Sequence, residues 1–221
     1  KPIFDDQPIQ NIGALAIQQS NPSVVWAGTG EGNPRNSLNI GEGIYKSLDA
    51  GKTWKRMGLE KTRNIHRVIV DPNNPNTVYV AAIGNPYAQH PERGVYKTTD
   101  GGKTWRRTLF VNNQTGCSDL VMEPGNPTVF YAGTWRLIRT PYSLESGGDG
   151  SGLWKSTDAG ETWTNISTKK GLPKGVWGIV GVAVAPSNPD KIYTILENKD
   201  GGMYMSADGG ETWTLTSSDN N

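Results

Sequence analysis

Six acidic residues are the candidates for bond-breaking chemistry in this sequence: Glu31, Glu42, Glu92, Asp119, Glu145 and Glu197. Two carboxylates held roughly 5 to 10 Å apart can cleave a glycosidic bond, with one acting as the acid and the other as base or nucleophile. No spacing along the chain singles out two of the six. The catalytic assignment therefore stays open, with four weak candidates: Glu31, Glu92, Asp119 and Glu145.

Other kinds of catalytic centre find little support in the sequence. Cys117 is the single cysteine, and the two histidines, His66 and His90, are separated in the chain, so no set of residues has metal-ligand spacing. There is no Gly-x-Ser-x-Gly nucleophile motif, and no phosphate-loop Lys-Ser/Thr follows the glycine-rich segment 147–150. We predict neither a metal nor a cofactor.

The charge and hydropathy of the chain limit its partners. The 22 basic and 21 acidic residues are interspersed and leave a net charge of +1, which gives no field for nucleic acid or an anionic membrane. No apolar run approaches the roughly 18 to 20 residues of a transmembrane helix. A protein or a glycan is the expected partner.

Four copies of one motif organise the chain. Each copy reads glycine, an apolar residue, an aromatic residue, one further residue, and then Ser/Thr-x-Asp-x-Gly-x-Thr-Trp. The aspartates of the four copies are Asp49, Asp100, Asp158 and Asp208. A repeat of 50 to 58 residues is typical of solenoids and propellers.

Every repeat has an Asn-Pro step between two alternating apolar segments, at Asn21, Asn74, Asn126 and Asn188. Alternating apolar residues lie before and after this step, and two more short segments flank the motif, so each repeat offers four strands. We predict an all-β propeller built of four-stranded antiparallel blades. The four blades should span residues 12–60, 61–111, 112–169 and 170–217.

The repeated motif itself is predicted to be structural. Its aspartate can accept hydrogen bonds from the backbone of its own turn, and the glycine two residues later can adopt positive φ without strain. One copy in each blade cannot be four active sites. The tryptophans that end the motif should pack between blades: Trp54, Trp105, Trp163 and Trp213.

These motifs resemble the Asp-box, or BNR, repeat of sialidase-like β-propellers. The segments Trp26–Glu31 and Pro91–Tyr96 look like large secreted bacterial proteins labelled glycosyl hydrolase or sortilin (VPS10)-like. The resemblance covers essentially the whole chain and implies a secreted or periplasmic protein. It leaves the activity open, because the same box occurs in sialidases, xyloglucanases, sortilin-type receptors and photosystem assembly factors.

Propellers of this kind usually have six or more blades. The resemblance therefore implies that the four blades are a portion of a larger propeller, completed by further blades from the same chain or another subunit. A closed four-bladed ring is the alternative.

Binding is expected on the face opposite the Asp boxes, where the loops between second and third strands vary most in length. Aligning the first strands on the Asn-Pro step places Arg67 beside Asp119 at the mouth of the central channel, either as an inter-blade ion pair or as a ligand-facing pair. The long segment Thr134–Ser151 could bind a sugar or peptide, or could pin itself to a neighbouring domain. The candidates for the ligand-binding face are Arg35, His66, Arg67, His90, Arg93, Trp135, Arg136, Arg139, Tyr142, Asp149 and Glu197.

Two functions fit these residues. We favour a non-catalytic recognition or scaffold propeller that binds protein or glycan through the variable loops, since it explains them without a catalytic pair. The alternative is a glycoside hydrolase of the xyloglucanase or sialidase kind. Sialidase chemistry is the less favoured of these two, because no arginine triad can be assembled with confidence.

Overall fold

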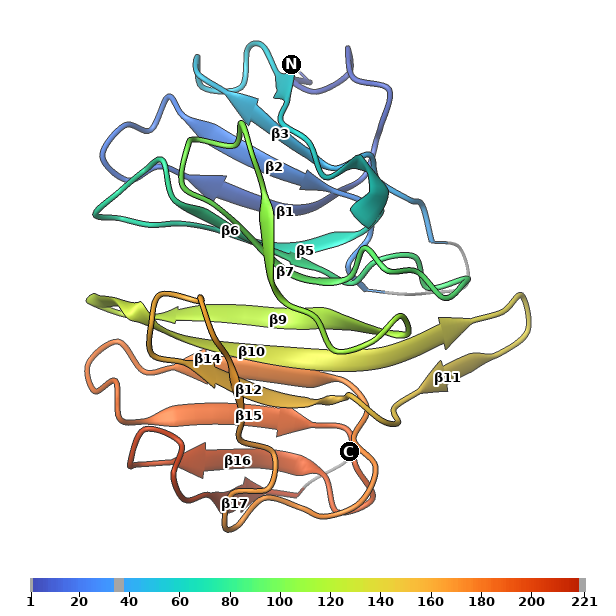
Figure 1. The fold of residues 1–221 in the computed structure, drawn as a ribbon, viewed down its shortest axis with the longest axis vertical. Coiled ribbons are helices and arrows are strands. Elements are labelled where there is room, and N and C mark those ends of the chain that lie inside the picture. Colours follow the sequence, from blue (N-terminus) through green and yellow to red (C-terminus); the bar gives the residue numbers. More distant parts are fainter. Residues whose placement is uncertain (1, 34–37, 219–221) are drawn as a thin grey trace.

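The computed structural model of the protein describes residues 2–33 and 38–218 (Figure 1). Strand follows strand in four antiparallel sheets, each in the order of the chain. The first sheet holds β1 (Ile12–Ile17), β2 (Val25–Thr29), β3 (Ile44–Ser47) and β4 (Lys55–Arg56). The second holds β5 (Ile65–Val70), β6 (Val78–Ala82), β7 (Gly94–Thr98) and β8 (Arg106–Leu109). A short 3₁₀ turn, η1 (Glu60–Thr62), lies between them.

The third sheet is longer than the others. It contains β9 (Thr115–Glu123), β10 (Asn126–Arg139), β12 (Gly152–Ser156) and β13 (Thr164–Asn165), and β11 (Leu144–Ser146) pairs with the far end of β10. The fourth sheet holds β14 (Val180–Val184), β15 (Ile192–Leu196), β16 (Gly202–Ser206) and β17 (Thr214–Ser217). The all-β fold of four-stranded antiparallel blades, predicted from the sequence, is confirmed.

The first strands of the sheets, β1, β5, β9 and β14, lie side by side along the middle of the molecule (Figure 1). Alternation within these strands decides which face packs inward. In β14, Val180, Val182 and Val184 are buried, whereas Ala183 between them is exposed. The neighbouring sheets therefore stack face to face around this line of first strands.

A separate buried cluster fills each space between neighbouring sheets. Examples are Trp26 with Ile65 between the first and second sheets, Tyr79 with Phe130 between the second and third, and Leu153 with Val182 between the third and fourth. These aromatic and aliphatic side chains remove large apolar areas from water, which is what holds one sheet against the next.

The tryptophans of the second, third and fourth boxes contact the preceding sheet, whereas Trp54 of the first box donates to the Ile3 carbonyl at 2.7 Å and packs against the N-terminal segment. Trp105 donates from Nε1 to the carbonyl of Met57 at 2.7 Å, and Trp163 donates to Thr108 Oγ1 at 3.4 Å. Trp213 is buried in the cluster between the third and fourth sheets. Each indole thus combines apolar packing with a polar contact at its edge, or lies wholly within an inter-sheet core.

The first Asp box shows how the motif closes its turn. Asp49 accepts hydrogen bonds from the backbone N–H of Thr53 at 2.8 Å and from its hydroxyl at 2.7 Å. Ser47 Oγ donates to the same carboxylate and accepts from the Gly51 N–H, each at 2.8 Å. Gly51 has a φ of 85°, which other residues rarely adopt. The three other boxes repeat these contacts.

Acid should weaken the fold through these boxes. Hydrogen bonds from the box threonines lower the pKa of Asp49, Asp158 and Asp208 to about 2, and that of Asp100 further below its usual range. Because the folded-state pKa is depressed, the stabilisation is present above the unfolded pKa of about 3.9 and is lost as pH falls towards 2. We expect the thermal midpoint, followed by circular dichroism, to fall between pH 4 and pH 2. In Asp208→Asn this fall should be smaller, and an unchanged pH profile would contradict the assignment.

A lysine in the third strand links each of the first three sheets to the next one. The ammonium groups of Lys46, Lys97 and Lys155 lie over the aromatic rings of Trp26, Tyr79 and Tyr131. Each also donates to a carbonyl in the following box turn, at 3.4 Å to Gly101, 2.8 Å to Ala159 and 2.7 Å to Gly209. Met205 takes the place of this lysine in the fourth sheet.

Candidate functional site

The loops between second and third strands lie at one end of the sheets, which we call the loop face. Their described residues are 30–33 and 38–43 of the first sheet, 83–93 of the second and 197–201 of the fourth, and in the third sheet they include the β10–β11 hairpin. The Asp boxes lie at the opposite end, since they join third to fourth strands. In Figure 1 the loop face is on the right, and the hairpin extends beyond it.

Asp119 ties three sheets together at the first strands. Its Oδ1 accepts from Arg67 Nε of β5 at 2.8 Å and from the Leu120 N–H of β9 at 3.0 Å, and its Oδ2 accepts from the Val182 N–H of β14 at 2.9 Å. The side chain of Asp119 is 11% exposed and that of Arg67 is 43% exposed. The two residues are neighbours, as the alignment of repeats predicts, and they form an inter-sheet ion pair.

His66 lies beside this ion pair at an irregularity in the pairing of β5 with β6. Burial and then the charge of Arg67 lower its pKa to about 4, although Asp119 acts in the opposite direction. The backbone of Gly32 approaches the imidazole so closely that a side chain at this position would collide with it. His66 is therefore neutral near pH 7 and packed under the first loop.

Arg93 does not face a ligand. Its side chain is fully buried and donates to four backbone carbonyls of the loop face: Ile83, Asn85, Ala88 and Gln114. Burial lowers the pKa of its guanidinium to about 10. The expectation that Arg93 belongs to the binding surface is wrong, because the loop folds around the guanidinium.

Trp135 and Arg139 are also buried, at 4% and 9% exposure, so neither is a surface for ligand. The reason lies in the segment that carries them. Residues 134–139 continue strand β10, with 134–136 paired to β9 and 137–139 paired to β11, whereas a loop was expected over Thr134–Ser151. Side chains along a paired strand alternate between faces, and these two fall on covered sides.

The hairpin is pinned to its surroundings by hydrogen bonds. Arg136 donates to Gln114 Oε1 at 3.0 Å, to the Gly147 carbonyl at 2.9 Å and to Glu145 Oε2 at 3.3 Å. A second chain of contacts crosses to the fourth sheet: the indole of Trp135 donates to Ser146 Oγ at 2.8 Å, which donates to Glu197 at 2.5 Å. The hairpin is thereby held to the connector that precedes β9 and to the fourth sheet.

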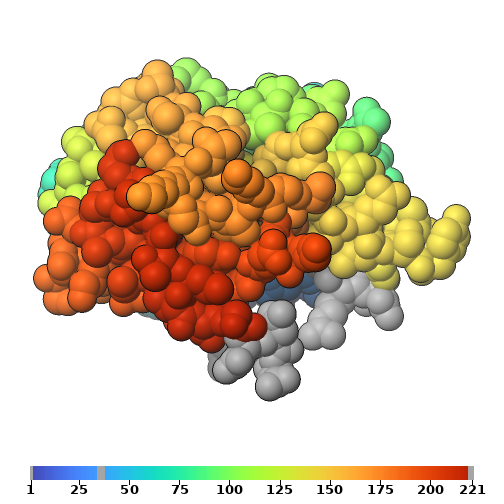
Figure 2. All heavy atoms as spheres, turned by 90° about the horizontal axis from the view of Figure 1, so that it is seen from below, coloured from blue at the N-terminus to red at the C-terminus, as the bar shows by residue number. Residues whose placement is uncertain are grey.

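Aromatic and acidic side chains remain exposed on the loop face. Tyr142, at the tip of the hairpin, is 91% exposed, and Tyr87 is 44% exposed with its hydroxyl accepting from the Leu38 N–H. Asp149 is exposed, and burial lowers the pKa of the partly covered His90. Arg35 lies outside the described residues. Figure 2 shows the hairpin, in yellow, projecting from the rest of the surface.

The four weak catalytic candidates each hold a different partner. Glu31 accepts from the Asn39 N–H at 3.0 Å, Glu92 accepts from the Tyr96 hydroxyl at 3.0 Å, and Glu145 and Asp119 pair with arginines. Each carboxylate thus already has a structural contact on its own part of the face. These contacts do not single out an acid and base pair.

Sequence reasoning missed a hollow of about 520 Å³ between the third and fourth sheets. It is formed by the connector from β13 to β14, residues 166–179, which is longer than the connectors at 57–64 and 110–114. The signal was available, since the distance from the box aspartate to the next Asn-Pro step is longest in this repeat.

A family model described as "Sortilin, neurotensin receptor 3" matches residues 42–169, and the BNR/Asp-box repeat matches residues 204–215. The chain belongs to the Sortilin-Vps10 family. This Sortilin-Vps10 assignment agrees with the four Asp-box sheets.

Similar proteins include the xyloglucanase Xgh74A of Acetivibrio thermocellus, 30% identical over 199 residues, which cover 72% of this chain and 22% of that protein. A probable oligoxyloglucan-reducing end-specific xyloglucanase of Neosartorya fischeri is 27% identical over 215 residues, which cover 85% of this chain and 24% of that protein. The crystal structure of the Niastella koreensis GH74 enzyme matches with a TM-score of 0.65 at 26% identity, over 92% of this chain and 30% of that one. The chain thus spans about a quarter of the length of the curated relatives it matches.

Within residues 2–33 and 38–218, no three His, Cys, Asp or Glu side chains are grouped so that they could hold a metal ion. The same residues contain no helix with the length and apolarity needed to cross a membrane.

Proposed function

We propose that the protein is a glycoside hydrolase acting on a polysaccharide of the xyloglucan kind, and that the sheets described here supply part of its substrate-binding surface. The main support is the similarity to xyloglucanases, which extends over 72% and 85% of the chain in two of them. Because the chain spans only about a quarter of those relatives, the hydrolytic activity is proposed for the whole protein. This proposal adopts the hydrolase alternative in place of the non-catalytic propeller that we favoured from the sequence.

The β10–β11 hairpin is the observation that carries the binding role. It presents Tyr142 with 91% of the residue exposed, while Arg136 and the Trp135–Ser146 contact fix its base. An aromatic ring on a rigid support can stack on the apolar face of a sugar ring with little loss of conformational freedom. The exposed ring thus suits a polysaccharide passing across the loop face.

Binding of xyloglucan and its cleavage can be measured in separate experiments. We expect retention of the protein in a native gel containing xyloglucan, together with release of reducing ends from the polymer by the whole protein. Retention without any release of reducing ends would favour the second candidate, a non-catalytic glycan-binding propeller. That candidate is supported by the structural contacts already made by Glu31, Glu92, Asp119 and Glu145.

Tyr142→Ala should weaken retention by xyloglucan by about 5- to 10-fold, since an aromatic contact is worth about 1 kcal/mol. The thermal midpoint should stay within about 1 °C of the parent, because the side chain is 91% exposed. Tyr193→Ala is the control, because Tyr193 lies on β15 away from the tip of the hairpin, and its retention by xyloglucan should match that of the parent. Equal retention of Tyr142→Ala and the parent would remove the hairpin from the binding surface.

The proposal also includes further blades around these four, so that residues 1–221 are a single portion of one propeller. Leu15 and Ile17 on the first sheet are 65% and 57% exposed, and Ile195 and Leu215 on the fourth are 64% and 44% exposed. Apolar sheet faces of this kind are normally covered by another layer. A polymeric substrate, which is too large to be taken up intact, favours a secreted or periplasmic location.

A further inference from the structure

Glu197 directly follows β15 and lies between two segments of the loop face. Its Oε2 accepts a hydrogen bond from Ser146 Oγ of β11 at 2.5 Å and another from the Ile179 N–H, just before β14, at 2.9 Å. The backbone of Glu197 adds two more contacts, donating to the Ile179 carbonyl at 3.1 Å and accepting from the Gly178 N–H at 2.7 Å. One carboxylate oxygen therefore joins the β10–β11 hairpin of the third sheet to the fourth sheet.

The hydroxyl of Ser146 has a fixed role in this contact. The indole N–H of Trp135 donates to Ser146 Oγ at 2.8 Å, and the hydroxyl proton of Ser146 is donated to Glu197. Hydrogen bonds to an ionised acceptor are roughly twice as strong as those between neutral groups. The chain of contacts that starts at the buried indole therefore depends on an acceptor at position 197.

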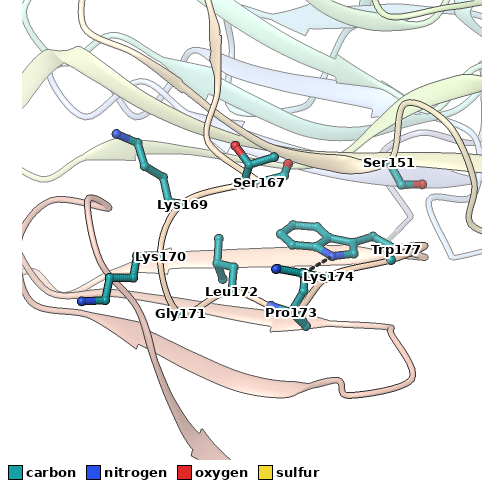
Figure 3. A pocket seen from close by; sticks show the side chains of 11 residues that line it. Ser151, Ser167, Lys169, Lys170, Gly171, Leu172, Pro173, Lys174 and Trp177 are labelled. Atoms are coloured by element: carbon teal, nitrogen blue, oxygen red, sulfur yellow. Dashed lines mark hydrogen bonds between the residues drawn. The ribbon is translucent and has the colours of Figure 1, made fainter.

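The backbone on the other side of the carboxylate is itself held in place. A Cβ at Gly178 would lie 2.0 Å from Oε2 of Glu197, so the connector backbone lies directly against the carboxylate. The neighbouring Trp177 is 4% exposed, and its indole donates to the Pro173 carbonyl at 3.0 Å, as the dashed line in Figure 3 shows. The Trp177 carbonyl in turn accepts from the Gly148 N–H at 3.1 Å. The base of the hairpin is thus held by a connector with its own internal contacts.

The outer part of the hairpin depends on this base for its orientation. β11 pairs with β10 over three residues only, and short two-stranded hairpins are marginally stable on their own in water. On the β10 side, the Arg139 N–H donates to the Pro86 carbonyl of the second loop at 2.8 Å. On the β11 side, the side-chain contact with Glu197 ties the strand to the fourth sheet. Tyr142 at the tip is 91% exposed, so its place is set by the strands below it.

We propose that Glu197 is a positioning residue for the sugar-binding hairpin. By holding Ser146 against the fourth sheet, it keeps the ring of Tyr142 in the orientation that stacks on the polysaccharide. A group that is oriented before binding loses less conformational freedom on binding, which improves affinity without any new contact. This inference rests on the proposed function, because Tyr142 is the contact through which Glu197 acts.

Glu197→Ala should weaken retention of the protein by xyloglucan by about 3- to 5-fold, which corresponds to the loss of one ordinary hydrogen bond. Glu197→Gln keeps an acceptor oxygen at the same place and should recover part of the lost affinity. In the Tyr142→Ala background, Glu197→Ala should have no further effect, because the ring that it positions is gone. A further loss as large as that in the parent would mean that Glu197 touches the sugar itself, and would overturn the proposal.

Hydrogen exchange at the Trp135 indole N–H, followed in ¹H–¹⁵N spectra, reports on the base of the hairpin without any ligand. Exchange should be at least about threefold faster in Glu197→Ala, since its acceptor Ser146 is no longer held. Unchanged exchange would overturn the proposal. Glu211→Ala is the matched control: Glu211 belongs to the box of the same sheet, and its carboxylate pairs with Lys169, so neither exchange nor retention should change.

The two proposals fail in different ways. If the parent protein is not retained by xyloglucan, the proposed function fails and the role of Glu197 fails with it. If the parent is retained and Glu197→Ala is retained equally well, only the role of Glu197 is overturned. A purely structural role would change the indole exchange of Glu197→Ala but would not make its effect on affinity depend on Tyr142.

Discussion

Replacing Arg93 by alanine is expected to lower the free energy of unfolding by about 3–5 kcal/mol. Four buried carbonyls would lose their donor, at about 1 kcal/mol or more each, and the fully buried side chain would leave a cavity. Arg93→Lys should recover only part of this loss, because an ammonium cannot reproduce the planar fork of a guanidinium. Urea unfolding followed by tryptophan fluorescence measures the difference.

Arg106→Ala is the control for this experiment. Its side chain is 57% exposed and pairs with Glu161, so its removal should cost no more than about 1 kcal/mol. If Arg93→Ala were no less stable than Arg106→Ala, the buried guanidinium would not be organising the second loop.

Asp119→Ala should destabilise the protein by about 3 kcal/mol, the second large effect. The substitution removes the acceptor of two backbone N–H groups in different sheets, and hydrogen bonds to a charged group contribute about 1.5–3 kcal/mol each. Arg67→Gln breaks the ion pair and the hydrogen bond from Arg67 to the His66 carbonyl but leaves both backbone contacts of Asp119, and with 43% of the Arg67 side chain exposed it should cost about 1 kcal/mol or less. Both values come from the same urea titrations.

The comparison of these two variants identifies which contact matters. A loss in Arg67→Gln as large as that in Asp119→Ala would mean that the ion pair, rather than the backbone contacts of the carboxylate, joins the three sheets.

The repeats made the fold predictable. Box aspartates and Asn-Pro steps recur at similar distances, and each marks a turn whose chemistry fixes the strands on either side. The same alignment was enough to bring Arg67 beside Asp119, because both lie at one position of the repeated first strand. Because every repeat contains the same first strand, the place of a residue in one blade gives the place of the aligned residues in the other blades.

The loop face could not be predicted in the same way, because its segments do not repeat. Arg93 follows a proline-rich loop that could equally have left it in water, and nothing in the sequence shows four carbonyls turning towards it. Trp135 was expected on a loop, yet β10 continues through it and buries it. Burial here depends on how unlike segments from neighbouring sheets meet.

The lysine contacts between sheets give the repeats a direction. Lys46, Lys97 and Lys155 all reach forward along the chain, from a third strand to the box of the following sheet. The second and third repeats each carry both the lysine and the receiving carbonyl, so exchanging them would preserve every such contact. The fourth repeat carries a receiving carbonyl at Gly209 but Met205 in place of the lysine, and moved to an interior position it would leave the next box without a donor. By this criterion the second and third repeats are interchangeable, whereas the fourth fits only after the other three.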